Sequence, residues 1–189
     1  MVRVSNLSRL RLASVPTVPD GIDKVAAVAV TIGHDGSVLF IRRAERESDL
    51  WSGHFAFPGG RRDPRDGSIQ ATAERETMEE VGLDLREAAC VGALDCQVSP
   101  VRDPDGGLGV FPFVFHVVRW PSFVMSDEVA GVHPIALERL LSGEGRGTFP
   151  YRFRDRDLVL PCIRLDDALI WGMTLRMVDE LLARLRGVR

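Results

Sequence analysis

The segment from Ile69 to Val81 sets the strongest limit on how this chain can fold. It contains good helix formers and neither glycine nor proline, and Gly82 follows where a glycine commonly ends a helix. The sequence therefore predicts a helix over 69–81. Because strand-like segments lie on both sides of this helix, we expect an α+β protein or a mixed sandwich.

Apolar runs around this helix predict the strands. Residues 25–32 are almost all apolar, and Asp35-Gly36 supplies the positive φ that a tight hairpin requires, so residues 38–41 are expected to form the return strand. A short strand at 55–57 should end at Pro58. Further strands are expected at 88–94 and 110–118, mainly β structure at 149–165, and helices at 135–141 and 171–185.

The length of 189 residues favours one domain, which we expect at 21–189 after an N-terminal segment at 1–20. Arg3, Arg9 and Arg11 precede the first acid, Asp20, and this composition leans toward a transit peptide. The stretch is brief and no removal site is evident. We therefore favour a segment that packs on the domain and a cytoplasmic protein, and a targeting peptide remains the alternative.

Composition argues against several classes of partner. The net charge is −3 without a basic stripe, so we expect no nucleic acid, and no apolar run approaches the ~20 residues of a membrane span. Cys90, Cys96 and Cys162 lack the paired spacing of a disulfide framework or a zinc site, and we expect them reduced and buried. A small-molecule substrate is the expected partner, and a homodimer is left open.

Three carboxylates carry the chemistry. Glu76, Glu79 and Glu80 stand at i, i+3 and i+4 and share one face of the predicted helix, while Ala71, Met78 and Val81 are expected to face the sheet. Like charges on one face repel, and a cation would remove that cost. Oxygen ligands select hard ions, so the pattern predicts a Mg²⁺ or Mn²⁺ site.

A solvated acidic face is the usual explanation of an isolated E-x-x-E-E pattern. Here the pattern also includes Arg75, Gly82 and the upstream Gly59-Gly60 pair. The string R-E-x-x-E-E-x-G has on the order of a 10⁻⁴ chance of arising in a chain this long. We therefore favour a metal site, which a backbone carbonyl of the Pro58-Gly59-Gly60 turn could complete.

The stretch 59–83 resembles the Nudix box, G-x5-E-x7-R-E-U-x-E-E-x-G-U, where U is apolar. Two positions depart from it: Asp66 stands for the first glutamate with eight rather than seven residues before Arg75, and Thr77 replaces an apolar residue. The matching positions are Gly60, Arg75, Glu76, Glu79, Glu80, Gly82 and Leu83.

The resemblance implies a Nudix fold, in which a mixed β-sheet lies between helices, and a metal-dependent hydrolase that cleaves a diphosphate linkage. It assigns Arg75 an orienting role opposite Asp66, with Gly60, Asp66 and Gly82 as structural residues of the box. It assigns metal binding to Glu76, Glu79, Glu80 and the carbonyl of Gly59.

The chain is also similar to the coenzyme A pyrophosphatase branch of that family. Matches include Leu39, Arg43, Gly53, residues 57–60 and residues 170–174. Glu45 and Asp49 depart by placing negative charge where that branch has alanine and arginine. Coenzyme A or a related compound is the expected substrate, and ADP-ribose, a nucleotide sugar or another nucleotide is the alternative.

The general base has two kinds of candidate. In this family it is sometimes a box glutamate, here Glu76 or Glu79, and sometimes a carboxylate on a distant loop, here Glu128. Arg43, His54 and Trp51 are candidates for substrate contact, although His54 and Trp51 fit simple packing as well.

Two other functions share the same fold. A catalytically inactive Nudix module that binds a ligand is disfavoured because all three box glutamates are present. Isopentenyl diphosphate isomerase needs a catalytic cysteine and histidine ligands, and the absence of a Cys-x-His arrangement disfavours it.

Overall fold

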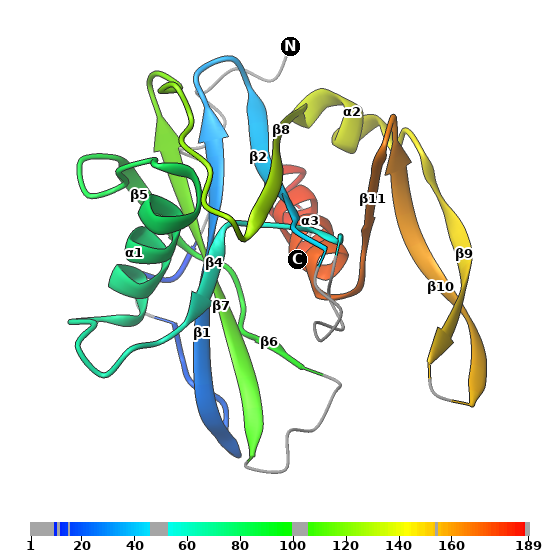
Figure 1. The fold of residues 1–189 in the computed structure, drawn as a ribbon, viewed down its shortest axis with the longest axis horizontal. Coiled ribbons are helices and arrows are strands. Elements are labelled where there is room, and N and C mark those ends of the chain that lie inside the picture. The colour runs from blue at the N-terminus through cyan, green and yellow to red at the C-terminus, as the bar shows by residue number, and fades with distance from the viewer. Residues whose placement is uncertain are drawn as a thin grey trace.

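The computed structural model describes residues 10, 12–14, 16–45, 53–99, 106–153 and 155–187. The larger sheet is built around β1 (Ile22–Gly33), which runs parallel to β7 (Gly107–Val117) and antiparallel to β2 (Ser37–Arg43) (Figure 1). Its main path continues to β3 (Phe55–Ala56) at one end and β5 (Ala89–Ala93) at the other. Three strands lie off this path: β4 (Gly59–Arg61), β6 (Gln97–Val98) and β8 (Val129–Ala136).

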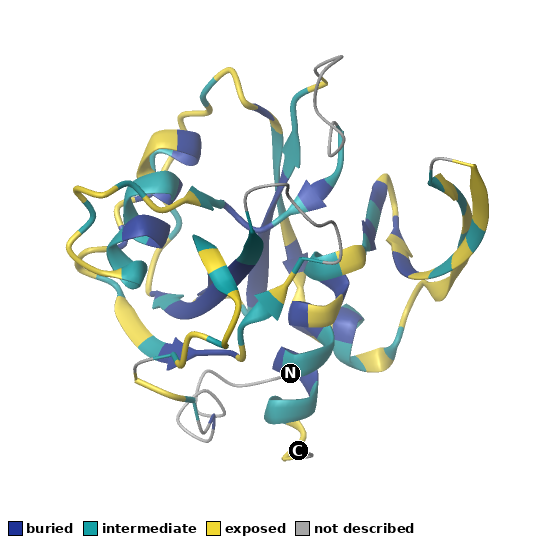
Figure 2. Ribbon diagram, turned by 90° about the horizontal axis from the view of Figure 1, so that it is seen from below, coloured by how far each residue is buried: buried dark blue, intermediate teal, exposed yellow. Residues whose placement is uncertain are grey.

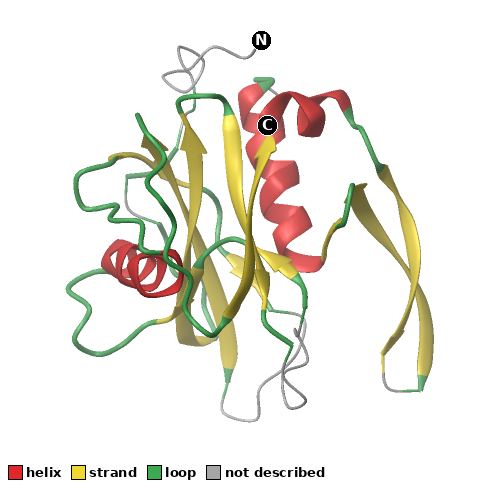
Figure 3. Cartoon of the chain, turned by 45° about the horizontal axis from the view of Figure 1, so that its top comes forward, coloured by secondary structure: helices red, strands yellow, loops and turns green. Residues whose placement is uncertain are grey.

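Helices cover both faces of this sheet, because strand residues that point to opposite faces are both apolar (Figures 1 and 3). The helix α1 (Ile69–Val81) packs over Ala27 and Ala29, whose small side chains let it approach β1 closely. The helices α2 (Leu137–Ser142) and α3 (Gly172–Leu185) contribute to the core on the other face. The expected α+β class, with a mixed sheet between helices, is confirmed.

A second sheet contains β9 (Arg146–Phe153), β10 (Arg156–Leu165) and β11 (Ala168–Trp171). The hairpin of β9 and β10 stands away from the larger sheet (Figures 1 and 3). Exposed and half-buried residues alternate along it, as Figure 2 shows. The expectation of β structure at 149–165 is therefore correct, and the strands extend beyond it.

The strand β8 was not predicted. Gly131 and Pro134 interrupt its apolar pattern, yet it pairs antiparallel with β2 and, among the described strands, with β2 alone. Proline is tolerated at such an edge position. The helix expected at 135–141 accordingly begins only at Leu137, because Ile135 and Ala136 complete the strand.

Two smaller expectations have different outcomes. In the described part of the N-terminal segment, Leu10 is buried and Ala13 bridges to Ala93, as packing on the domain requires. All three cysteines are free, but only Cys162 is buried, and Cys90 is exposed because it lies on the terminal strand of the sheet. None of the helices in the described residues is long and apolar enough to cross a membrane.

Candidate active site

The helix α1 carries the predicted site and has well-defined ends. The Ser68 side chain accepts a hydrogen bond from the Ala71 N–H at 3.0 Å, which satisfies one of the free donors of the first turn. At the other end Gly82 adopts φ 69°, a left-handed conformation that glycine favours, and its N–H donates to the Met78 carbonyl. The predicted ends of the helix are confirmed.

The face of α1 that meets the sheet differs from the prediction. Met78 was expected to face the sheet but is 50% exposed, while Val81 is buried as expected. The buried residues are Thr72, Ala73, Thr77, Glu80 and Val81. The stripe of α1 that packs against β1 contains Ala73, Thr77, Glu80 and Val81. The helix is therefore rotated from the expected orientation, and Glu80 turns inward.

The three box glutamates consequently differ in exposure. The side chain of Glu79 is 58% exposed and that of Glu76 is 18% exposed, whereas Glu80 is only 5% exposed. A uniform carboxylate face was expected, and the structure instead arranges the three groups from solvent toward the sheet.

Glu80 is held by the strand that precedes the helix. The Gly59 N–H donates to Glu80 Oε2 at 2.8 Å, and Gly59 itself pairs with Val28 of β1. A Cβ atom at Gly59 would collide with the Ala27 carbonyl, and one at Gly60 would collide with the Glu76 carboxylate. Both glycines are therefore required for β4 to lie between β1 and the carboxylates.

The pKa of Glu80 is raised to about 7, chiefly by burial, with the Gly59 N–H and Arg43 lowering it and the charges of Glu76 and Glu128 raising it. Burial also raises the pKa of Glu76, against the lowering effect of Arg75. The structure thus brings Arg43, Glu76, Glu80 and Glu128 within electrostatic reach of one another. A bound cation would favour the ionised carboxylates.

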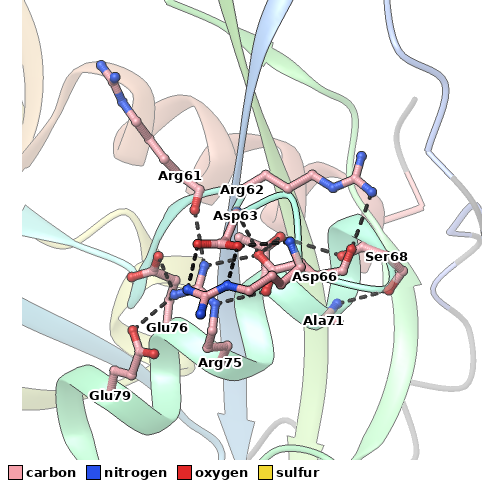
Figure 4. A network of polar contacts seen from close by, with 11 residues as sticks. Arg61, Arg62, Asp63, Asp66, Ser68, Ala71, Arg75, Glu76 and Glu79 are labelled. Atoms are coloured by element: carbon pink, nitrogen blue, oxygen red, sulfur yellow. Dashed lines mark hydrogen bonds and ion pairs between the residues drawn. The ribbon is translucent and has the colours of Figure 1, made fainter.

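Arg75 connects the helix to the preceding loop (Figure 4). Its Nε lies 2.9 Å from Asp66 Oδ1 and its Nη2 lies 3.0 Å from Asp66 Oδ2, so the expected contact is present. Its Nη1 lies 2.9 Å from Glu76 and 3.0 Å from Glu79. Arg75 therefore orients two of the three box glutamates.

Both departures from the Nudix box are accommodated locally. Asp66 also accepts hydrogen bonds from the Thr72 hydroxyl at 2.8 Å and the Asp63 N–H at 2.9 Å, so its shorter side chain is fully engaged. Thr77 donates its hydroxyl to the Ala73 carbonyl at 2.7 Å, which satisfies this buried polar group within the helix. Thr72 was not predicted as a site residue.

The group suits a hard divalent cation, because Glu76, Glu79 and Glu80 offer carboxylate oxygens, the ligands that such ions prefer. Among the described residues, however, no three acidic, histidine or cysteine side chains are already arranged around a common ion position. Glu79 and Glu76 contact Arg75, and Glu80 faces Gly59. The side chains of Glu76, Glu79 and Glu80 would have to reorient to hold one ion together.

The loop that carries Glu128 is docked on the end of α1. The Ser126 N–H donates to the Glu80 carbonyl and the Val124 N–H to the Val81 carbonyl, each at 3.0 Å. The backbone carbonyl of Glu128 accepts from Ala44 at 2.8 Å, and its side chain is exposed. This loop brings Glu128 to the site from a distant part of the sequence.

The substrate candidates are only partly placed. The Arg43 N–H donates to the His54 carbonyl at 3.0 Å, which links His54 to the site through β2. The half-buried His54 ring lies edge-on to Trp171, with 4.9 Å between ring centroids. Trp51 and Asp49 lie outside the described residues. Trp171 was noted only within the 170–174 match, and the structure adds it as a neighbour of His54.

A family model described as the NUDIX domain matches residues 23–156, which is more than half of the chain. The chain belongs to the Nudix hydrolase family. The solved structures support the same Nudix fold: the NUDIX domain of Shewanella oneidensis NrtR, solved with ADP ribose, superposes with a TM-score of 0.56 at 16% identity, and covers 89% of this chain and 90% of that one.

Two curated Nudix relatives share about a third of the aligned sequence. Human mitochondrial coenzyme A diphosphatase NUDT8 is 32% identical over 145 residues, which are 73% of this chain and 58% of the human protein. NudL of Photorhabdus laumondii, an uncharacterized Nudix hydrolase, is 30% identical over 144 residues, which are 76% of this chain and 74% of that protein.

A third relative is similar over a shorter stretch. An uncharacterized protein of Schizosaccharomyces pombe is 57% identical over 98 residues, which are 48% of this chain and 28% of that protein. The chain thus spans under two thirds of the length of both the yeast and the human relative.

Proposed function

We propose that this Nudix chain is a metal-dependent pyrophosphohydrolase that cleaves the diphosphate linkage of a nucleoside-diphosphate derivative, with coenzyme A or a related compound as the first choice. The observation that carries this proposal is the buried Glu80 carboxylate, which is held on the Gly59 N–H beside Glu76 and within electrostatic reach of Glu128. Burying several carboxylates together is unfavourable unless a cation or a proton balances them.

Each residue of the site has a definite part in this reaction. Glu76, Glu79, Glu80 and the Gly59 carbonyl would hold Mg²⁺ or Mn²⁺, which when bound neutralises diphosphate oxygens and lowers the pKa of water. Arg75 orients Glu76 and Glu79 through its contact with Asp66. Glu128 or a box glutamate accepts a proton from the attacking water. The water oxygen then forms the new bond to phosphorus, and the bridging oxygen leaves with the other phosphate.

The choice of coenzyme A rests on the matches at Arg43, Gly53, residues 57–60 and residues 170–174, and on the name of the human relative. Two acids weigh against it. Glu45 forms an exposed ion pair with Arg42 at 3.5 Å, which partly offsets its negative charge. Asp49 is a second acid, at a sequence position where that branch has arginine. These acids favour a less charged substrate such as ADP-ribose as the second candidate.

The test is a substrate panel of coenzyme A, ADP-ribose, NADH, dinucleoside polyphosphates and oxidised nucleotides with Mg²⁺ and with Mn²⁺. We expect the highest kcat/KM for coenzyme A and a further gain for Asp49→Arg. A wild-type preference for ADP-ribose of about tenfold or more, roughly 1.4 kcal/mol, would overturn the choice of coenzyme A. Failure to hydrolyse any compound would instead support an inactive binding module.

We also propose a cytoplasmic location, which fits a chain whose three cysteines lack the paired spacing of a disulfide framework. The human relative is named as mitochondrial. Imaging the full chain with a C-terminal fluorescent tag tests the proposal, and co-localisation with mitochondria would overturn it.

A further inference from the structure

The loop between β7 and β8, residues 118–128, brings Glu128 to the site and contains no helix or strand. It passes beside α1 (Figure 1), and the backbone amides of Val124 and Ser126 each donate to a carbonyl in the last turn of that helix at 3.0 Å. The side chains of Val124 and Met125 are exposed, so they bury little apolar surface on the helix. Because two hydrogen bonds that replace bonds to water add little net stability, the loop requires another anchor.

Trp120, near the start of the loop, lies on the last residue of β1. A Cβ atom at Gly33 would come within 2.4 Å of two carbon atoms of the Trp120 indole, so the ring occupies the space that a side chain would fill. The backbone of Gly33 does not have a positive φ, and its conformation therefore suits other residues as well. Room for the indole is the structural reason for a glycine at this position.

The N–H of the same indole is held by a hydrogen bond. Trp120 Nε1 lies 3.2 Å from Asp35 Oδ1 and 3.3 Å from Asp35 Oδ2. Asp35 is fixed in the turn between β1 and β2, where it accepts from the Ser37 N–H at 3.0 Å and from the Ser37 hydroxyl at 2.7 Å. The indole is thus attached by its face and by its N–H to the β1–β2 hairpin of the larger sheet.

Further contacts connect Trp120 to Glu128 along the loop. The ring centroids of Trp120 and Phe123 are 5.9 Å apart, and both rings pack on the core between α1 and the sheet. Val124 and Ser126 follow with their bonds to α1, and the Ser126 hydroxyl accepts from the Glu128 N–H at 3.3 Å. The loop is thus held at short intervals from the indole to Glu128, and release of the indole would free its first half.

We propose that Trp120 is a positioning residue for hydrolysis. By docking on Gly33 and Asp35 it fixes the loop, and so holds Glu128 where this carboxylate accepts the proton of the attacking water. Glu128 lies within electrostatic reach of Glu80 in this arrangement, and a small displacement of a catalytic group lowers the rate steeply. The inference rests on the proposed function and selects Glu128 as the general base.

Backbone hydrogen exchange without substrate or metal tests the docking itself. Trp120→Ala removes the anchor, whereas Gly33→Ala displaces the indole and leaves Trp120 in the chain. Gly147→Ala is the matched control, because a Cβ atom there meets nothing within 4 Å and its backbone has no positive φ. We expect exchange at the Val124 and Ser126 amides to accelerate at least ~10-fold in the first two variants and to match wild type in the control.

Kinetics with the best substrate of the panel test the link to Glu128. We expect Trp120→Ala and Gly33→Ala to lower kcat by roughly 10–100-fold and to leave KM and Mn²⁺ affinity nearly unchanged, because the box is untouched. Trp120→Phe keeps a ring over Gly33 and should restore most of the kcat. In a Glu128→Gln background, Trp120→Ala should lower kcat no further, since it acts through Glu128.

Full kcat in Trp120→Ala or in Glu128→Gln would overturn the proposal, and so would a further loss of kcat when the two substitutions are combined. Unchanged exchange at Val124 and Ser126 would do the same, because the loop would then stay docked without Trp120. If Trp120→Ala fails to fold, as judged by circular dichroism, Gly33→Ala carries the test. A wild type that hydrolyses no compound of the panel would end the proposed function, whereas hydrogen exchange would still decide whether Trp120 holds the loop.

Discussion

Arg75 and Asp66 form a bidentate ion pair, in which Nε lies 2.9 Å from Oδ1 and Nη2 lies 3.0 Å from Oδ2. The Asp66 side chain is only 6% exposed. Its carboxylate accepts hydrogen bonds from the Arg75 guanidinium, the Thr72 hydroxyl and the Asp63 N–H. The pair joins the loop before α1 to the second turn of the helix. It thereby holds the Arg75 guanidinium in the position where it forms ion pairs with Glu76 and Glu79.

Replacing Asp66 by alanine should destabilise the protein by about 1–3 kcal/mol, because Arg75, Thr72 and the Asp63 N–H each lose a charged acceptor. Asp63→Ala is the control, since the Asp63 carboxylate pairs with Arg65 on the surface and its loss should have little effect. Urea unfolding measures both. Equal stability of the two variants would contradict the structural role of Asp66.

The same ion pair predicts a pH dependence. Hydrogen bonds from Arg75 lower the pKa of Asp66 in the folded state, so the folded protein binds this proton less readily than the unfolded chain. The resulting stabilisation is complete above the unfolded pKa of about 3.9 and is lost as the pH falls below it. The difference in unfolding free energy between wild type and Asp66→Ala should therefore shrink in acid.

Glu80→Gln should stabilise the metal-free protein at alkaline pH. The pKa of Glu80 is raised from 4.5 to about 7 on folding, so the stability contributed by this group decreases as the pH rises through that window. Above it the ionised, buried carboxylate is unfavourable by on the order of 3 kcal/mol, since one pKa unit corresponds to about 1.4 kcal/mol.

Urea unfolding in the presence of a chelator, at about pH 4 and about pH 8, tests this expectation. Glutamine retains an acceptor for the Gly59 N–H, so the variant isolates the effect of charge. The variant and wild type should be equally stable at the lower pH and should differ at the higher. A less stable Glu80→Gln protein at the higher pH would contradict the assigned cause.

Glu79→Gln should reduce turnover by roughly tenfold or more, the scale expected for the loss of a metal ligand, and should weaken Mn²⁺ binding measured by electron paramagnetic resonance. Glu74→Gln is the matched control on the same helix, because Glu74 accepts a hydrogen bond from Gln70 at 2.7 Å and is not one of the box glutamates. Full metal-dependent activity in Glu79→Gln would exclude it from the metal site.

Glu128→Gln separates the two candidates for the general base. If Glu128 accepts the proton, kcat should fall by ~10²–10⁴ with Mn²⁺ affinity unchanged, and the acidic limb of the pH–rate profile should disappear. Asp127→Asn, at the neighbouring position in the same turn, should leave kcat nearly unchanged. If Glu128→Gln keeps its activity, the base belongs to the box, and Glu76→Gln should then lose both turnover and metal affinity.

Features that depend on neighbours in sequence were predictable. The ends of α1 follow from Ser68 and Gly82, because capping satisfies backbone groups within one turn of the helix. The hairpin between β1 and β2 follows from Asp35-Gly36, where Gly36 has φ 76°. The contact of Arg75 with Asp66 was also predictable, since both belong to one short motif and carry opposite charges.

The sequence by itself determined the helix, most of the strands around it and the candidates for metal binding, because periodicity, caps and charge spacing act locally. Tertiary structure decided which side of α1 is buried, since packing against Ala27 and Ala29 of β1 and the hydrogen bond from the Gly59 N–H turn Glu80 inward and leave Met78 in solvent. It also brought Glu128 within electrostatic reach of Glu80, because the pairing of β8 with β2 and the docking of residues 124–126 on α1 join segments far apart in the chain. Such contacts depend on which surfaces pack together, and this packing is set by residues of several segments at once rather than by any one segment.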